Sequence, residues 1–216
     1  MKIWILKTWR ENKSFVLFMA LMFVFRSAVA DWNDVPTGSM KPTIVEGDRI
    51  LVNKLAYDVR LPFTHVSLFK LSDPARGDII VFDSDVSGKR LVKRVVGIPG
   101  DVVALKDNVL SINGEALEYD AIAATASTLD KQEDLLGVEH RIRIDKRGTQ
   151  QSNFEPIEVP AGFYLALGDN RDNSADSRVM GLVPRDEIVG RSKRVVVSLN
   201  YENYYLPRKD RFFHTL

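Results

Sequence analysis

The sequence has 216 residues, of which 45% are hydrophobic, and its formal net charge is +1 at pH 7. This length and composition suit a folded chain with a buried core, and the near balance of charges argues against nucleic acid as the main partner. Cysteine is absent, and the three histidines, His65, His140 and His214, do not lie at metal-ligand spacing, so we expect no disulfide, no cysteine nucleophile, no metal and no cofactor.

The first predicted element is a membrane segment near the N-terminus. Residues 1–13 carry four basic side chains and one acidic side chain, and a mainly apolar run over 14–30 follows. A spanning helix needs about 20 apolar residues, so this run spans a bilayer only if both ends extend and Arg26 snorkels to the interface. Basic residues before such a segment favour a cytoplasmic N-terminus. We expect 1–13 to be cytoplasmic, 14–30 to be a single-pass anchor in the cytoplasmic (inner) membrane, and the rest to be external.

A cleavable signal peptide is the alternative for the same segment. Ala28-Val29-Ala30 resembles a small-residue cleavage site, which is typical of such peptides. The anchor is favoured because Arg26 interrupts the apolar run just before that site, and because of the motif around Ser39 that follows.

The remainder of the chain is predicted to be mainly β. The dipeptide Gly-Asp occurs four times, and its first three copies each precede a short run rich in β-branched residues. A turn followed by a short apolar strand is typical of a sandwich or a barrel. The expected strands cover residues 49–54, 79–82, 91–98, 102–106, 109–112 and 188–199. Asp107-Asn108 and Asn113-Gly114 are expected to form tight turns.

Residues from about 117 to 155 differ in composition from the rest. They are polar, mixed in charge and only weakly periodic, and regular structure is expected to return near 158–167. We therefore expect a β core in two parts, 31–116 and 156–216, divided by a small inserted cap over 117–155.

The segment Pro36-Thr-Gly-Ser-Met-Lys-Pro-Thr43 contains a candidate nucleophile. Gly38 permits a sharp turn beside Ser39, and Pro42 restricts the chain soon after it. A serine on a constrained turn with a free amide suits a nucleophile with an oxyanion hole. An ordinary surface turn is the alternative, and a Ser–His–Asp triad is disfavoured because no histidine lies in a motif-like segment.

Lys93 is the candidate base. If residues 91–96 form a strand, Leu91, Lys93 and Val95 share one face, and their apolar surroundings lower the pKa of the lysine. A neutral amine can then accept the serine proton, whereas the guanidinium of Arg94 stays protonated. The alternative is a half-exposed strand lysine whose stem covers apolar surface.

A third segment, Gly168-Asp-Asn-Arg-Asp-Asn-Ser-Ala-Asp-Ser-Arg178, is too polar for a core element and too patterned for a linker. It suits either a loop cross-linked by its own ion pairs or the rigid support of an active site. Calcium binding by its aspartates is disfavoured, since the spacing and the terminal Glu of a calcium loop are missing.

Taken together and in this order, these segments resemble the sequence motifs of bacterial type I signal peptidases. The resemblance covers residues 36 to about 191, apart from the cap, and includes Lys93-Arg94-Val-Val-Gly-Ile-Pro-Gly-Asp101. It implies a mainly β catalytic fold that is shared with self-cleaving LexA-type repressors, and a membrane-bound serine endopeptidase that removes signal peptides after Ala-x-Ala sequences.

The same resemblance assigns roles to individual residues. It makes Ser39 the nucleophile, Lys93 the general base and Ser174 the hydroxyl that orients Lys93. The oxyanion hole is the Ser39 amide with the Thr37 hydroxyl, where many family members have Ser in place of Thr. The remaining implied residues are Met40, which helps form small substrate pockets, and the supporting ion pairs Asp169–Arg94 and Asp176–Arg178.

Two other functions and one open question accompany this reading. A LexA-like autoprotease needs an N-terminal DNA-binding element, and a non-catalytic membrane-tethered β module fits a chain without the dyad. Many Gram-negative family members have two membrane helices, whereas this chain has room for one, so a specialised paralogue stays open. The expected partners are signal peptides, the lipid bilayer, and secretion or conjugation/pilus machinery.

Overall fold

The computed structural model describes residues 2–64 and 66–216, and over residues 2–11 it describes the backbone alone. Met1 and His65 lie outside the described residues, and so do the side chains of Lys2, Lys7 and Arg10, on which the predicted membrane orientation rests in part. The helices are α1 (Lys2–Ala28) and α2 (Ser177–Met180).

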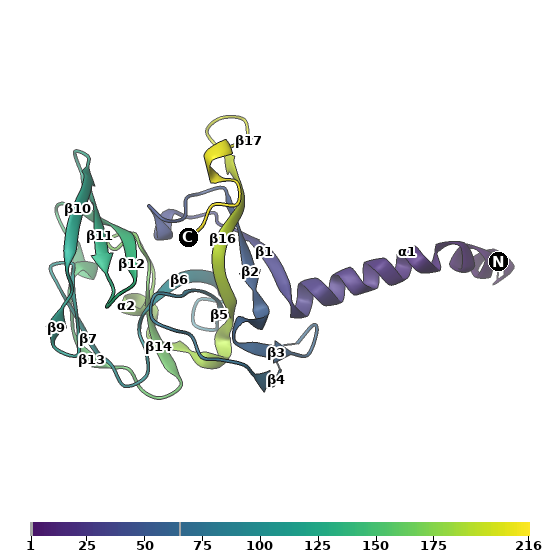
Figure 1. Cartoon of the computed structure of the whole chain (residues 1–216), viewed down its shortest axis with the longest axis horizontal. Coiled ribbons are helices and arrows are strands. Elements are labelled where there is room, and N and C mark those ends of the chain that lie inside the picture. The colour runs from purple at the N-terminus through teal and green to yellow at the C-terminus, as the bar shows by residue number, and fades with distance from the viewer. Residues whose placement is uncertain (1, 65) are drawn as a thin grey trace.

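An antiparallel sheet of eight strands forms the body of the molecule (Figure 1). In spatial order its strands are β1 (Ala30–Asp34), β2 (Asp48–Asn53), β16 (Ile188–Asn200), β5 (Ile79–Ser84), β6 (Lys89–Gly97), β14 (Phe163–Leu167) and β15 (Val183–Pro184), and β17 (Leu206–Pro207) pairs with β16. Successive residues of β5 enter different core clusters, Ile79 and Val81 one cluster, Ile80 and Phe82 the other. Both faces of the sheet are therefore covered at β5, which explains its unbroken apolar run.

A second group of strands lies to the left of this sheet in Figure 1. It comprises a four-stranded sheet of β13 (Phe154–Glu158), β7 (Val102–Lys106), β8 (Val109–Ile112) and β9 (Glu115–Ala116), and a three-stranded sheet of β10 (Tyr119–Ala124), β11 (Thr128–Asp134) and β12 (Glu139–Asp145). The predicted turn at Asp107-Asn108 is confirmed, since it joins β7 to β8 with φ values of 50° and 61°. Such left-handed angles are what a two-residue hairpin turn requires.

The predicted cap region, 117–155, contains regular strands. On β12 the inward side chains of His140, Ile142 and Ile144 alternate with charged residues, and Leu135 packs into the same core cluster as Val103. The charged residues on the outer face obscured this apolar alternation in the sequence. The division into a core and an inserted cap stays a prediction.

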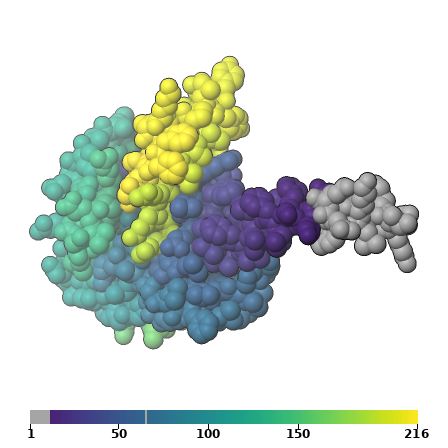
Figure 2. Space-filling view, turned by 45° about the vertical axis from the view of Figure 1, so that its right-hand side comes forward, coloured from purple at the N-terminus to yellow at the C-terminus, as the bar shows by residue number. Residues whose placement is uncertain are grey.

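Helix α1 stands out from the β body (Figures 1 and 2). At its base, Arg26 pairs with Asp31 at 2.7 Å, and the Lys54 ammonium donates to the carbonyl oxygens of Arg26 and Ser27. These contacts fix the last turn of the helix against β1 and the turn after β2.

The predicted transmembrane anchor over 14–30 is not supported by this structure. Within the described part of the chain, no helix is both long and apolar enough to cross a bilayer. The uncharged run between Lys13 and Arg26 is shorter than the about 20 residues that a spanning helix needs.

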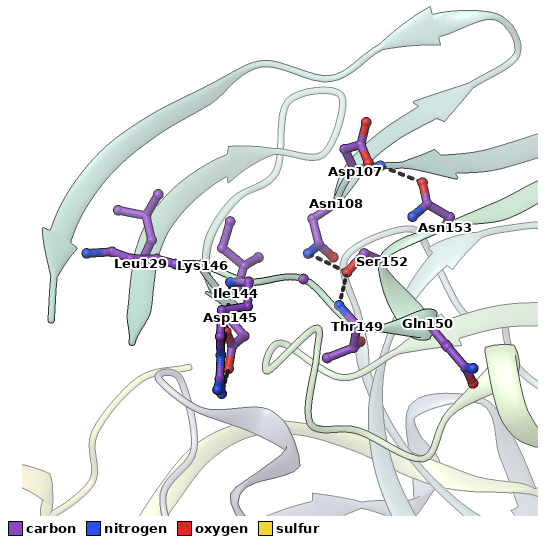
Figure 3. Close-up of a pocket in the computed structure, with 12 residues that line it drawn as sticks. Asp107, Asn108, Leu129, Ile144, Asp145, Lys146, Thr149, Gln150, Ser152 and Asn153 are labelled. Carbon is purple, nitrogen blue, oxygen red and sulfur yellow. Dashed lines mark hydrogen bonds and ion pairs between the residues drawn. The ribbon is translucent and has the colours of Figure 1, made fainter. Parts of the chain in front are cut away.

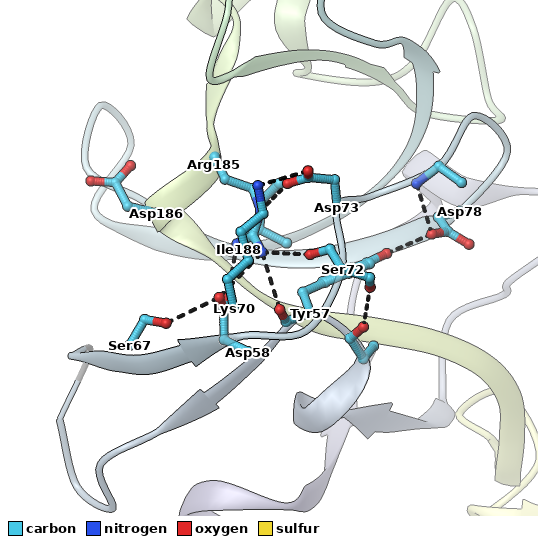
Figure 4. A network of polar contacts seen from close by, with 12 residues as sticks. Tyr57, Asp58, Ser67, Lys70, Ser72, Asp73, Asp78, Arg185, Asp186 and Ile188 are labelled. Atoms are coloured by element: carbon cyan, nitrogen blue, oxygen red, sulfur yellow. Dashed lines mark hydrogen bonds and ion pairs between the residues drawn. The ribbon is translucent and has the colours of Figure 1, made fainter.

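A hairpin beside the base of α1, made of β3 (Asp58–Arg60) and β4 (Ser67–Lys70), is tied to the body by Arg185 (Figure 4). The Arg185 guanidinium donates to Asp58 at 2.8 Å and to Asp73 at 3.2 Å. This network holds the hairpin against the start of β16.

Candidate active site

Ser39 lies on a single 3₁₀ turn, Gly38–Met40, that follows β1. Asn170 fixes this turn from the side, because its backbone N–H donates to the Ser39 carbonyl oxygen at 3.0 Å and its side-chain amide donates to the Gly38 carbonyl oxygen at 2.9 Å. Met40 is fully buried below the turn. The Ser39 hydroxyl is thereby held at the surface of a rigid support.

Lys93 reaches Ser39 from β6. Its ammonium nitrogen lies 3.0 Å from the Ser39 Oγ and 2.9 Å from the Val92 carbonyl oxygen, and the residue is only 3% exposed. Burial lowers the pKa of Lys93 to about 8, although the negative charges of Asp176 and Asp169 oppose that shift. The two residues whose proximity was predicted from the sequence therefore form a hydrogen-bonded pair, and a substantial fraction of the amine is neutral near pH 8.

The two predicted ion pairs of the loop 168–178 are both present. Arg94 contacts Asp169 through two hydrogen bonds of 2.9 and 2.8 Å, and Arg178 contacts Asp176 through two of 2.8 and 2.7 Å. Asp176 also caps α2. Burial tends to raise the pKa of Asp176, but the Arg178 guanidinium outweighs this and keeps the pKa below its usual value.

Ser174 is buried in the same loop and lines a cavity together with Ser39 and Lys93. The predicted hydrogen bond to Lys93 is not formed, and the Ser174 hydroxyl lies close enough to Asp176 to help lower the pKa of that carboxyl. A methyl group placed on Gly168 would lie 2.2 Å from the Ser174 Oγ and 2.4 Å from the Ser39 carbonyl oxygen. Gly168 thus allows the loop to approach the Ser39 turn, and the orienting role of Ser174 stays a prediction.

Thr37 immediately precedes the Ser39 turn, and Met40 is its last residue. Thr37 is exposed and lines the cavity that contains Ser39. The Ser39 amide lies in the first turn of a 3₁₀ helix, where N–H groups lack intrahelical acceptors. Met40 packs into the core beside Ile44 and Val52 and is 0% exposed, so it lies beneath the cavity and offers little surface to a substrate.

Two cavities meet at Ser39 and Lys93. The α1-side cavity, of about 580 Å³, is lined by Arg26, residues 31–37, Ser39, Met40 and residues 89–93. The loop-side cavity, of about 800 Å³, is lined by residues 37–39, Ser87, Lys89, Leu91, Lys93, residues 149–151, residues 172–175 and Met180. A bound peptide can therefore extend in both directions from the Ser39 hydroxyl.

Two strand edges face the α1-side cavity. Among the residues that the structure describes, β1 pairs with β2 alone and β14 pairs with β6 only from Arg94 onward, so β1 and the start of β6 each have a free edge. Free edges of this kind can hydrogen-bond an extended peptide.

A buried charge network supports the loop from behind. Glu133 of β11 accepts hydrogen bonds from Arg171 and Tyr119, and its carboxylate lies 3.1 Å from the His140 ring. Burial tends to raise the pKa of Glu133, but Arg171 and His140 lower it to about 2. In the described part of the chain, no three His, Asp or Glu side chains are grouped to hold a metal.

Sequence reasoning assigned no role to Gly168 and Asn170, which shape this site, or to Asp172 of the same loop. All three lie in the third motif, so their positions were visible. Their partners were not, since Asn170 contacts a residue 132 positions away in the chain.

Comparison with known proteins confirms the resemblance seen in the motifs. The family model described as "Signal peptidase, peptidase S26" matches residues 8–197. The chain is 40% identical to "Signal peptidase I" of Pseudomonas fluorescens and 38% identical to that of Pseudomonas aeruginosa, in each case over 87% of this chain and 72% of the relative. It is 33% identical to "Signal peptidase I" of Bacillus amyloliquefaciens over 87% of this chain and 84% of the relative. The chain belongs to the signal peptidase family, peptidase S26, and is a serine peptidase.

Proposed function

We propose that this protein is an endopeptidase that removes N-terminal signal peptides from preproteins, with Ser39 as the nucleophile and Lys93 as the general base. The observation that carries the proposal is the 3.0 Å contact between the Lys93 amine and the Ser39 hydroxyl in a buried site. A pKa of about 8 supports it, because a base works best when its pKa is near the working pH.

The proposed reaction runs in two steps. Neutral Lys93 accepts the Ser39 proton as the Oγ attacks the scissile carbonyl carbon, and the negative oxygen is stabilised by the Ser39 N–H and the Thr37 hydroxyl. The Lys93 ammonium then donates its proton to the leaving amine, which leaves an ester on Ser39. A water molecule, deprotonated by the neutral amine, hydrolyses that ester and restores the enzyme.

The α1-side cavity supports specificity for small residues before the cut. Its lining includes Val35, Leu91, Val92 and the buried Met40. An extended peptide held along the free edges of β1 and β6 would present alternate side chains to these walls, which suits an Ala-x-Ala sequence.

Attachment to the lipid bilayer is part of the proposal. Large apolar side chains of α1 are exposed, and they are Phe15, Val16, Leu17, Phe18, Leu21, Met22, Phe23, Val24 and Phe25. Lipid contact would remove this surface from water. We propose that residues 14–30 hold the chain at the cytoplasmic membrane, with the β body on the external face.

Incubation of the detergent-solubilised protein with a preprotein tests the peptidase. We expect one cut after Ala-x-Ala, and no cut by Ser39→Ala. A protein that binds the preprotein without cutting it would favour a non-catalytic module, and one that cuts only its own chain would favour an autoprotease.

Protease protection in spheroplasts tests the membrane arrangement separately. Added protease should degrade the β body while the cells stay intact. Protection of the β body until lysis would show the opposite orientation, and release of the whole chain by alkaline carbonate would show that residues 14–30 do not hold it.

A further inference from the structure

One carboxylate holds the segment between β12 and β13 in place. The Asp172 Oδ1 accepts hydrogen bonds from the hydroxyls of Thr149 at 2.9 Å and Ser152 at 2.6 Å. Its Oδ2 accepts hydrogen bonds from the Asn108 side chain at 2.8 Å and from the Asp145 backbone N–H at 2.9 Å. Four donors therefore converge on one side chain, and three of them belong to residues 145–152.

This segment is a wall shared by two cavities. Thr149 and Gln150 line both the loop-side cavity and a third cavity of about 670 Å³, which reaches the turn at Asp107-Asn108 (Figure 3). In Figure 3, Asn108, Ser152 and Thr149 are joined by hydrogen bonds along one side of this third cavity. A connected polar surface therefore leads from Ser39 away from α1.

The two ends of this path differ in character. The α1-side cavity begins at the base of an apolar helix, and its lining combines polar and charged residues with the apolar Trp32, Val35 and Val92, whereas the path past residues 149–153 is lined mainly by polar and charged side chains. A signal peptide is apolar and precedes the scissile bond, so on the proposed function it occupies the α1 side. The residues that follow the bond must then pass over Thr149 and Gln150.

We propose that residues 145–152 form the subsite for the first residues of the mature protein, bound as an extended polar peptide, and that Asp172 is the positioning residue of that subsite. This inference rests on the proposed function. It assigns to Asp172 a role in recognising the chain after the cut, distinct from the chemistry at Ser39.

The test compares two peptide substrates with the same Ala-x-Ala sequence, one with several residues after the cut and one with a single residue there. Asp172→Asn replaces one accepting oxygen with an NH₂ group that faces two donors, so the segment loses its fixed position. We expect kcat/KM for the long substrate to fall about tenfold, mainly through KM, and that for the short substrate to stay unchanged. Asp120→Asn, the same change at an exposed position on β10, should affect neither substrate.

Equal losses for both substrates would show that Asp172 only supports the dyad, and unchanged kinetics would show that it has no part in recognition; either result overturns the inference. If Asp172→Asn fails to fold by circular dichroism, Thr149→Val removes one of the four hydrogen bonds from an exposed side chain. We expect Thr149→Val to cause a smaller loss of kcat/KM, again for the long substrate alone, and the absence of that loss overturns the inference.

Wild-type protein that cuts neither peptide, or an active Ser39→Ala, would instead refute the proposed function.

Discussion

Lys93 is a buried lysine that forms no ion pair with any described residue. Its pKa is lowered because burial disfavours the ammonium, while the nearest acids, Asp169 and Asp176, are each already paired with an arginine. These carboxylates therefore offset little of the free-energy cost of removing the ammonium from water. A single residue in this environment can be neutral at a pH where ordinary lysines are charged.

The pH profile of cleavage should report this residue. In the proposed mechanism only neutral Lys93 accepts the Ser39 proton, so kcat/KM should rise with pH and level off above about 8. Lys93→Arg, which stays charged, should be folded and inactive at every pH in that range. An active Lys93→Arg would remove Lys93 from the mechanism, whereas Lys41→Ala, which lies on the same turn and pairs with Glu46, should keep most activity.

The same burial predicts a gain in stability on removing the charge. A pKa lowered from 10.5 to about 8 corresponds to about 3 kcal/mol of destabilisation of the charged form. Below pH 8 the lysine is protonated in both the folded and the unfolded protein, so the whole free-energy cost of burying the charge lowers stability. Between pH 8 and 10.5 this cost declines, because the lysine of the folded protein is neutral. Lys93→Met should therefore unfold at higher urea concentration at pH 7, with a smaller advantage at pH 10. A variant less stable than wild type at pH 7 would contradict this.

Gly168→Ala should damage activity more than stability. The added methyl would lie 2.4 Å from the Ser39 carbonyl oxygen, so the nucleophile turn must shift, and displacement by about an ångström can cost on the order of a hundredfold in rate. Gly162→Ala is the matched control, since its φ of 83° strains alanine while open space surrounds it. It should lower the melting temperature and leave kcat unchanged. Equal kcat for both variants would contradict the steric argument.

At the scale of elements, the sequence predicted those strands and turns whose formation depends on residues adjacent in the chain. The strands after Gly47-Asp48, Gly77-Asp78 and Gly100-Asp101 form as expected, because φ values between 86° and 91° at these glycines match the turn signals. The strands β10–β12 were not predicted, and on β12 charged residues on the outer face hide the apolar period. Burial of Met40 was missed because part of its core cluster, Ile79, Val81 and Val195, comes from strands distant in the sequence.

Glu133 of β11 should make the free energy of unfolding depend on pH in the acid range. Its pKa of about 2, against 4.5 for a free side chain, corresponds to about 3 kcal/mol that is fully present above pH 4.5 and is lost as the pH falls toward 2. Glu133→Gln leaves Arg171 without its buried counter-ion, so it should lower the unfolding free energy at pH 7 by several kcal/mol and weaken the acid dependence. Urea titrations at pH 7 and pH 3 measure both effects, and parallel losses at the two pH values would contradict the assignment.

At the scale of the whole molecule, α1 and the β body are joined at a small junction. The contacts of Arg26 and Ser27 with Asp31, Lys54 and Phe63 all lie at the last turn of the helix. Of the α1 residues whose side chains the structure describes, 12–28, none belongs to a core cluster.

A variant without residues 2–28 should therefore keep its fold. We expect its melting temperature to fall by a few degrees and its kcat/KM on a soluble peptide to stay near that of the full chain, whereas binding to lipid vesicles should be lost. Sedimentation with vesicles measures the last point. A truncated chain that fails to fold would show that α1 contributes to the core.

The meeting of two cavities at one hydroxyl has a consequence for product release. On the proposed function, once the bond is cut, the two fragments lie on opposite sides of Ser39, one in each cavity. The fragment attached as an ester can stay beside α1 while the amine fragment leaves past Thr149 and Gln150, which opens the loop-side cavity to the water needed for hydrolysis. On the proposed function, acyl transfer sets the order of departure: the mature protein is the amine fragment and leaves first, and the signal peptide follows once water has hydrolysed its ester.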